Sequence, residues 1–135
     1  MNSQVDWKLK VAEIREKCNL PSPERNVGIA ICLLDGEFFE IFAVSGKQSY
    51  NGVQNPTPAV RIFHLLDPPP GHYRGMDSEY KILENIASRY TQNKKVKGTI
   101  KLYTERKPCA SCQDVISQFR KMFLNIDVIV ESGDL

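Results

Sequence analysis

The chain has 135 residues, which is the size of one ordinary domain and enough to bury a hydrophobic core. Its hydrophobic and charged fractions, 41% and 25%, are typical of a globular protein, and a net charge of +2 neither indicates nor excludes a nucleic-acid partner. No apolar run approaches the roughly 18 residues that a membrane helix needs. Residues 1–4 also lack the basic-then-apolar start of a signal peptide. We therefore expect residues 1–135 to form a single domain with no membrane partner and no targeting signal in this chain.

The first third of the chain predicts a helix and a β-hairpin. Residues 4–18 have helical periodicity and should end before Pro21-Ser22-Pro23. Their inward face is expected to contain Val5, Leu9, Ala12 and Ile14, and their outward face the charged residues, Lys8, Lys10, Glu13, Arg15 and Glu16. Two extended runs, Val27 to Leu34 and Phe38 to Val44, flank Asp35-Gly36, which is a strong hairpin signal.

The rest of the chain predicts two helices that alternate with two strands. Residues 46–76 contain many prolines and glycines and indicate a long connection, with a short helical turn from Ala59 to Leu66. Helices are expected over residues 77–90 and 110–123, and strands over residues 99–104 and 126–130. This order of elements predicts an α/β fold, in which a mixed sheet of about four strands has helices packed on its faces.

Two short motifs, each at the start of a predicted helix, contain the residues with chemical potential. Asp77-Ser78-Glu79 opens one helix and Pro108-Cys109-Ala110-Ser111-Cys112 opens the next. Zinc binds thiolates and carboxylates, and a helix N-terminus favours the thiolate form of cysteine. Asp77, Cys109 and Cys112 could therefore hold Zn²⁺, with Glu79 beside it to carry protons. Glu79 falls on the apolar side of its helix, where an unpaired carboxylate would be costly.

Each motif also has simpler interpretations. An acid pair at a helix start is common because acids favour the helix dipole. A C-x-x-C pair after a strand also occurs in thioredoxin-like redox proteins, but those continue with more strands than this chain has. A structural zinc site would need four ligands, and Cys18 and Cys32 are poorly spaced to complete it. Cys32 is expected to be a plain buried thiol.

The paired motifs resemble those of the cytidine deaminase superfamily, which has H-x-E or C-x-E at one helix start and P-C-x-x-C at the next. The segment from Leu102 to Cys109 resembles the bacterial polymorphic-toxin deaminases in particular. The resemblance covers about residues 4–131 and implies a cytidine deaminase-like fold. The chain departs from the pattern at Asp77, where a histidine or cysteine is expected. His72 is the candidate that could replace Asp77 as the third ligand.

The resemblance implies zinc-dependent hydrolytic deamination of cytosine to uracil in nucleic acid, with DNA favoured over RNA. Glu79 would be the catalytic proton carrier, and Asp77, Cys109 and Cys112 the metal ligands. Residues near the motifs are candidates for substrate binding: Ser78, Tyr103, Lys107, Pro108, Phe63 and His64. Core packing is an equally good interpretation of Tyr103 and Phe63. A basic run before the cysteines could follow a phosphate backbone or be an ordinary solvated turn: Lys94, Lys95, Lys97, Lys101, Arg106 and Lys107.

Several alternatives stay open at this stage. Adenine deamination uses the same chemistry at C6, and a free nucleoside deaminase or a non-catalytic zinc- or nucleic-acid-binding module would keep the same fold. The toxin resemblance implies that the domain is the C-terminal module of a larger secreted protein and acts in the cytoplasm of a target cell. We expect a monomer, for which an immunity protein could be a partner.

Overall fold

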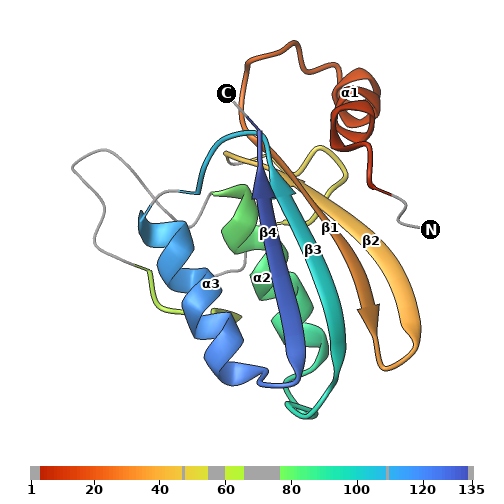
Figure 1. Cartoon of the computed structure of the whole chain (residues 1–135). Coiled ribbons are helices and arrows are strands. Elements are labelled where there is room, and N and C mark those ends of the chain that lie inside the picture. The colour runs from red at the N-terminus through yellow and green to blue at the C-terminus, as the bar shows by residue number, and fades with distance from the viewer. Residues whose placement is uncertain (1–3, 47, 55–59, 66–76, 109, 134–135) are drawn as a thin grey trace.

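The computed structural model describes residues 4–46, 48–54, 60–65, 77–108 and 110–133 (Figure 1). The elements follow the order α1 (Trp7–Cys18), β1 (Val27–Leu34), β2 (Glu37–Val44), α2 (Ser78–Arg89), β3 (Gly98–Thr104), α3 (Ala110–Met122) and β4 (Ile126–Ser132). This order confirms the predicted one, and the bounds differ by at most three residues. The predicted turn from Ala59 to Leu66 has both ends outside the described residues, and no helix forms across residues 60–65.

The four strands form one mixed sheet in the order β2-β1-β3-β4. β1 runs antiparallel to both β2 and β3, whereas β3 and β4 are parallel because α3 connects them as a crossover. Asp35 and Gly36 close the β1–β2 hairpin, and both have positive φ, which is why an Asp-Gly pair suits this turn. The predicted mixed α/β sheet is confirmed.

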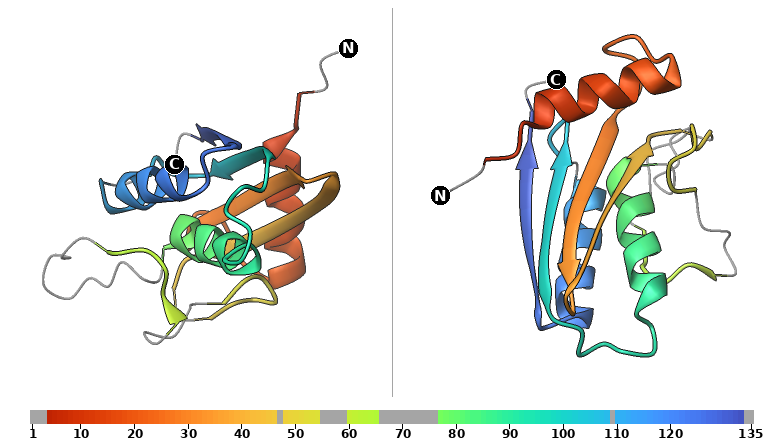
Figure 2. Two further views of the ribbon diagram at one scale, coloured as in Figure 1. Left: turned by 90° about the horizontal axis from the view of Figure 1, so that it is seen from below. Right: turned by 90° about the vertical axis from the view of Figure 1, so that its right-hand side faces the viewer.

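Helices α2 and α3 pack side by side on one face of the sheet (Figures 1 and 2). Their inward residues meet alternate residues of the strands, and the core includes Ala30, Cys32, Leu102, Ile82, Leu83, Ile86, Val115, Phe119 and Phe123. Cys32 is fully buried, as expected, and burial raises the pKa of its thiol to about 12. The apolar faces of both helices form this core together with the sheet.

Helix α1 crosses the opposite face of the sheet, at the end where β1 begins and β3 ends (Figure 2). There Val11 packs against Ile29 and Tyr103, and the ring of Trp7 stacks on that of Tyr103 with centroids 5.1 Å apart. The predicted inward face of α1 is only partly right: Ile14 packs against this cluster, but Leu9 is 55% exposed, whereas Arg15, assigned to the outer face, is 7% exposed. A buried acidic partner holds Arg15 inside, and a periodicity pattern contains no information about such a partner.

No helix within the described part of the chain is both long and apolar enough to cross a membrane.

Candidate active site

The starts of α2 and α3 meet at the end of the sheet where β3 finishes (Figure 1). Asp77 is the N-cap of α2 and has extended backbone angles, φ −70° and ψ 141°. Its side chain makes no capping hydrogen bond to the helix. Instead, the Asp77 Oδ2 atom lies 3.3 Å from the Sγ atom of Cys112, in the first turn of α3. The structure therefore brings together two of the residues that the sequence predicted as metal ligands.

Glu79 lies in the first turn of α2 and is 2% exposed. Its Oε2 atom accepts a hydrogen bond of 2.9 Å from the Cys112 thiol. Burial raises the pKa of the Glu79 carboxyl above its ordinary value, and the hydrogen bond from Cys112 opposes that rise. The nearby charge of Asp77 adds to the rise. A carboxyl whose pKa is raised by burial holds a proton more readily than an exposed one, which is a property of groups that carry protons in active sites.

The second carboxylate oxygen of Glu79 is held by Asn26 and Ser78. The Asn26 Nδ2 atom donates to Glu79 Oε1 at 3.0 Å and to Ser78 Oγ at 3.3 Å. The Ser78 hydroxyl in turn donates to Glu79 Oε1 at 3.3 Å. Ser78 is fully buried and contacts the Glu79 carboxyl.

Two of the residues predicted to bind the metal, Asp77 and Cys112, lie in the described part of the chain. Within that part, no group of three or more His, Cys, Asp and Glu side chains could hold a metal ion, and both Cys109 and His72 lie outside it. The thiol of Cys112 and the carboxylate of Asp77 are donors of the kind that zinc binds. Their 3.3 Å separation is close to the roughly 3.5 Å between sulfur and oxygen ligands that share one tetrahedral zinc. The described donors therefore fit zinc, with a further ligand still to be supplied.

A buried ion pair ties together the loops that frame this cluster. Arg15 of α1 and Glu105, just after β3, approach to 2.6 Å, and each side chain is 8% exposed. Arg15 also donates to backbone carbonyls in the loop that leads to Asn26, those of Leu20, Pro21, Glu24 and Arg25. Glu105 also accepts from the backbone N–H of Val27, at the start of β1. The ion pair thus fixes the loop before Asn26 to the loop before α3.

Two further buried charges attach surrounding segments to α2. The Nζ atom of Lys81 donates to the carbonyls of Val44 and Gly46 at 2.6 and 2.7 Å. Burial lowers the pKa of Lys81 to about 8, with the charge of Arg25 as a smaller cause. The Glu84 carboxylate accepts the backbone N–H groups of residues 62 and 63. Both side chains anchor loops to the helix that presents Glu79.

Three residues predicted for substrate binding lie away from the cluster or in the core. Tyr103 points to the α1 face of the sheet and stacks on Trp7, opposite to the face that α2 and α3 cover. Phe63 is buried and packs against Phe119, with ring centroids 6.0 Å apart. His64 is exposed, and its backbone N–H and carbonyl both bond to the side chain of Gln118. The structure does not bring Tyr103 to the Asp77–Cys112 cluster.

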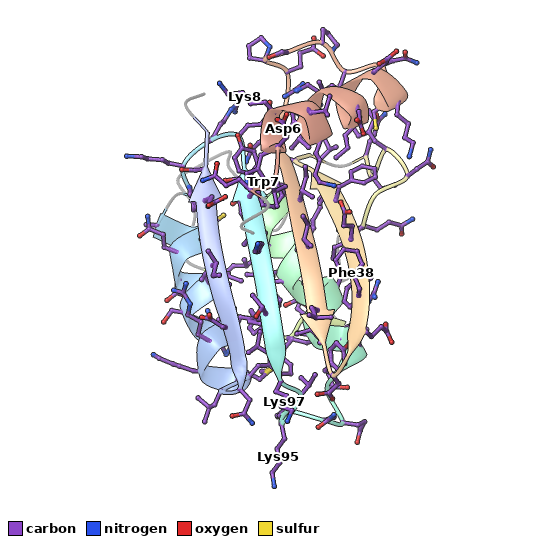
Figure 3. All side chains as sticks on the ribbon, turned by 45° about the vertical axis from the view of Figure 1, so that its right-hand side comes forward. Asp6, Trp7, Lys8, Phe38, Lys95 and Lys97 are labelled. Atoms are coloured by element: carbon purple, nitrogen blue, oxygen red, sulfur yellow. The ribbon has the colours of Figure 1, made fainter. Side chains whose placement is uncertain are left out.

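The basic run is divided between the two ends of the molecule. Lys94, Lys95 and Lys97 lie in the turn between α2 and β3, far from the cluster (Figure 3). Lys101 is exposed in the middle of β3, whereas Arg106 and Lys107 are exposed at the cluster's end of the sheet, next to the half-buried Pro108. Strand β3 places these two groups about 20 Å apart, so only Arg106 and Lys107 of the run lie at the cluster.

Sequence reasoning missed the residues that support the cluster from other elements, namely Asn26, Arg15, Glu105 and Lys81. None of them belongs to a motif. A charged residue inside an otherwise apolar helix pattern, as Lys81 is, would have been the clearest available signal.

Comparison with known proteins gives one result. The family model of toxin deaminases, described as the BURPS668_1122 family of deaminases, matches residues 48–133. The match includes α2, β3, α3 and β4, and with them both motifs of the cluster. No curated protein and no solved structure matches the chain.

Proposed function

The chain belongs to the BURPS668_1122 family of deaminases, and from this premise we propose that it converts cytosine to uracil in nucleic acid, DNA in preference to RNA. In this proposal Glu79 carries protons, and Asp77, Cys109 and Cys112 hold a zinc ion. One observation supports the proposal above all others. Residues from two helix starts, 35 positions apart in sequence, converge so that the Cys112 thiol contacts both carboxylates.

The residues of the cluster divide the chemistry of hydrolysis between them. Bound zinc would supply Lewis-acid activation of the attacking water. Glu79 accepts one proton from the attacking water and passes it to ring N3 as the oxygen bonds to C4. It then takes the remaining proton from the new C4 hydroxyl and delivers it to the departing amine. The C4–N4 bond breaks, ammonia leaves and a carbonyl forms at C4. Burial raises the pKa of the Glu79 carboxyl, which favours the step in which it accepts a proton.

A nucleic-acid substrate is supported by positive charge on the loops next to the cluster. Arg25, Arg106 and Lys107 are exposed on the two loops that flank Asn26, and the backbone N–H of Arg106 donates to the Asn26 Oδ1 atom. Cations placed beside the reacting carboxylate suit a ligand that has phosphates on both sides of the target base. A free nucleobase has no phosphate that could use them.

Membership of a toxin-deaminase family also supports a role as a toxin effector. We propose that the domain is the C-terminal module of a larger secreted protein, acts as a monomer in the cytoplasm of a target cell, and is neutralised by an immunity protein. Growth arrest of cells that produce the wild-type domain, but not of cells that produce Glu79→Gln, would support this role. Equal growth of the two would contradict it.

The deciding experiment measures uracil release in single-stranded DNA, duplex DNA and RNA that contain cytosine. The protein is assayed with zinc, after zinc removal, and as Glu79→Gln, which keeps the size of the side chain. Glu13→Gln, an exposed change on α1, is the matched control. We expect Glu79→Gln to lose a factor on the order of 10²–10⁴ in rate, which is the usual contribution of a general acid–base group. Zinc removal should abolish activity and zinc return should restore it.

Each alternative function has its own signature in this experiment. Deamination of free cytidine but of no polymer would show that the substrate is a free nucleoside. Conversion of adenosine to inosine would show that the target base is adenine. Zinc bound by Asp77, Cys109, Cys112 and a fourth side chain, with no product from any substrate, would indicate a non-catalytic binding module. Full activity of Glu79→Gln would refute the proposed role of Glu79.

A further inference from the structure

Asn26 contacts Ser78 and Glu79 at the start of α2 and the loop that leads into α3, without belonging to either motif. It precedes β1, the central strand between β2 and β3, and lies outside residues 48–133, the part of the chain that the family model matches. Its main chain is fixed by two bonds to Ser45, from Asn26 N to Ser45 Oγ at 2.8 Å and from Ser45 N to Asn26 O at 2.9 Å. The side chain therefore starts from a rigid position at the end of the sheet.

Every polar atom of the Asn26 side chain has a partner, and the partners fix its orientation. The Oδ1 atom accepts the backbone N–H of Arg106 at 3.2 Å, so it must be the carbonyl oxygen. The Nδ2 atom then faces Glu79 Oε1 at 3.0 Å, where an amide donor is required. The amide cannot be reversed without placing an oxygen against the carboxylate and an N–H against another N–H.

The contact with Glu79 selects which carboxylate oxygen is available for chemistry. Asn26 and Ser78 hold Oε1, so Oε2 is left directed at the Cys112 thiol, where the metal is expected. Both oxygens are buried with the residue, so no bulk water competes for this orientation. The bond from Arg106 meanwhile links the same amide to the loop that leads into α3.

We propose that Asn26 is a positioning residue, which holds the Glu79 carboxyl in the orientation for proton transfer and couples it to the loop before α3. This inference rests on the proposed role of Glu79 as the proton carrier. It predicts that Asn26 acts on the rate of the chemical step and leaves substrate binding and metal content unchanged.

Asn26→Asp is the sharpest test because it changes one atom group. The new side chain keeps an oxygen for the Arg106 N–H, but it loses the donor to Glu79 and places a carboxylate oxygen against Glu79 Oε1. The matched control is Asn93→Asp, at the far end of the sheet, where the Asn93 Nδ2 atom donates to the Asp35 carboxylate at 3.3 Å. The control removes the same kind of amide–carboxylate bond and should change neither kcat nor KM.

We expect Asn26→Asp to lower kcat by roughly 10- to 100-fold, a part of the general acid–base contribution, with KM within about twofold of wild type. Zinc content and the circular dichroism spectrum should match those of the control. A higher KM with an unchanged kcat would overturn the proposal, because Asn26 would then bind substrate. Unchanged kinetics, loss of zinc or loss of the folded spectrum would also overturn it.

A second measurement needs no substrate, so it separates this inference from the proposed function. The side-chain amide resonances of Asn26 are followed by ¹⁵N NMR in the wild type and in Glu79→Gln, with those of Asn93 as the reference. A change at Asn26 and none at Asn93 is expected, because the acceptor of the Asn26 N–H changes from a carboxyl to an amide. If the wild type deaminates nothing but this change is seen, the proposed function fails while the contact stands. An unchanged Asn26 resonance would refute the contact itself.

Discussion

Replacing Arg15 with methionine should destabilise the protein strongly, although Arg15 belongs to neither motif. The guanidinium is 8% exposed, pairs with Glu105 at 2.6 Å and donates to four backbone carbonyls of residues 20–25. Methionine keeps the length of the apolar stem but leaves the Glu105 carboxylate buried without its cation. Breaking a buried ion pair in this way typically costs about 3–5 kcal/mol, a large part of the 5–15 kcal/mol that stabilises an ordinary domain.

Urea unfolding measures this cost directly. Trp7 is the only tryptophan and stacks on Tyr103 under α1, so its fluorescence reports whether α1 is docked. The control is Lys10→Met, also on α1, which removes an exposed ion pair with Glu40 of β2. That pair should contribute no more than about 1 kcal/mol. The argument is refuted if Arg15→Met costs no more than Lys10→Met.

A double-mutant cycle identifies the source of the loss. If the cost comes from the stranded carboxylate, then adding Glu105→Gln to Arg15→Met should restore part of the stability, because the remaining side chain is neutral. If the losses in the free energy of unfolding caused by Arg15→Met and Glu105→Gln are additive, the Arg15 bonds to the backbone carbonyls hold the loop and the ion pair does not.

Two further predictions concern lysines. Lys81 has a folded-state pKa of about 8 against an ordinary value of 10.5, so its contribution to stability should be fully present above pH 10.5 and be lost as pH falls to 8. The free energy of unfolding of the wild type minus that of Lys81→Met should therefore increase as pH is raised from 8 to 10.5, and a difference that does not change with pH would refute the assignment. Lys107→Ala should raise KM for a polynucleotide and reduce its salt dependence, whereas Lys95→Ala at the opposite end should do neither; equal effects of the two changes would contradict a phosphate contact at the cluster.

Local pattern predicted the elements well because most of them are defined by short-range signals. The Asp35-Gly36 turn and the apolar faces of α2 and α3 were all readable from neighbouring residues. The inward face of α1 was not readable in this way, because Arg15 is held inside by Glu105, 90 positions away. A single sequence contains no signal for a partner at that distance.

The candidate site was predictable where motif spacing dictates geometry and unpredictable where strands reorient the chain. Asp77, Glu79 and Cys112 meet as expected, because each stands at a helix start on one end of the sheet. Tyr103 lies only a few positions before the cysteines, but strand alternation turns it to the α1 face while Leu102 enters the α2 face. Asn26 could not be linked to the site from the sequence, because its position beside Ser45 and opposite α2 depends on how the strands pair.

The position of β1 determines how much of this chain is needed for a stable fold. The part matched to the family begins at residue 48, after α1, β1 and β2, yet β1 is the strand to which β3 is paired along its whole length. A chain beginning at residue 48 would leave β3 with an open edge seven residues long and the core face of α2 partly uncovered. Such an edge invites strand exchange between copies. Strand β1, which precedes the matched residues, is therefore part of the folded unit that holds β3 and α2 in place.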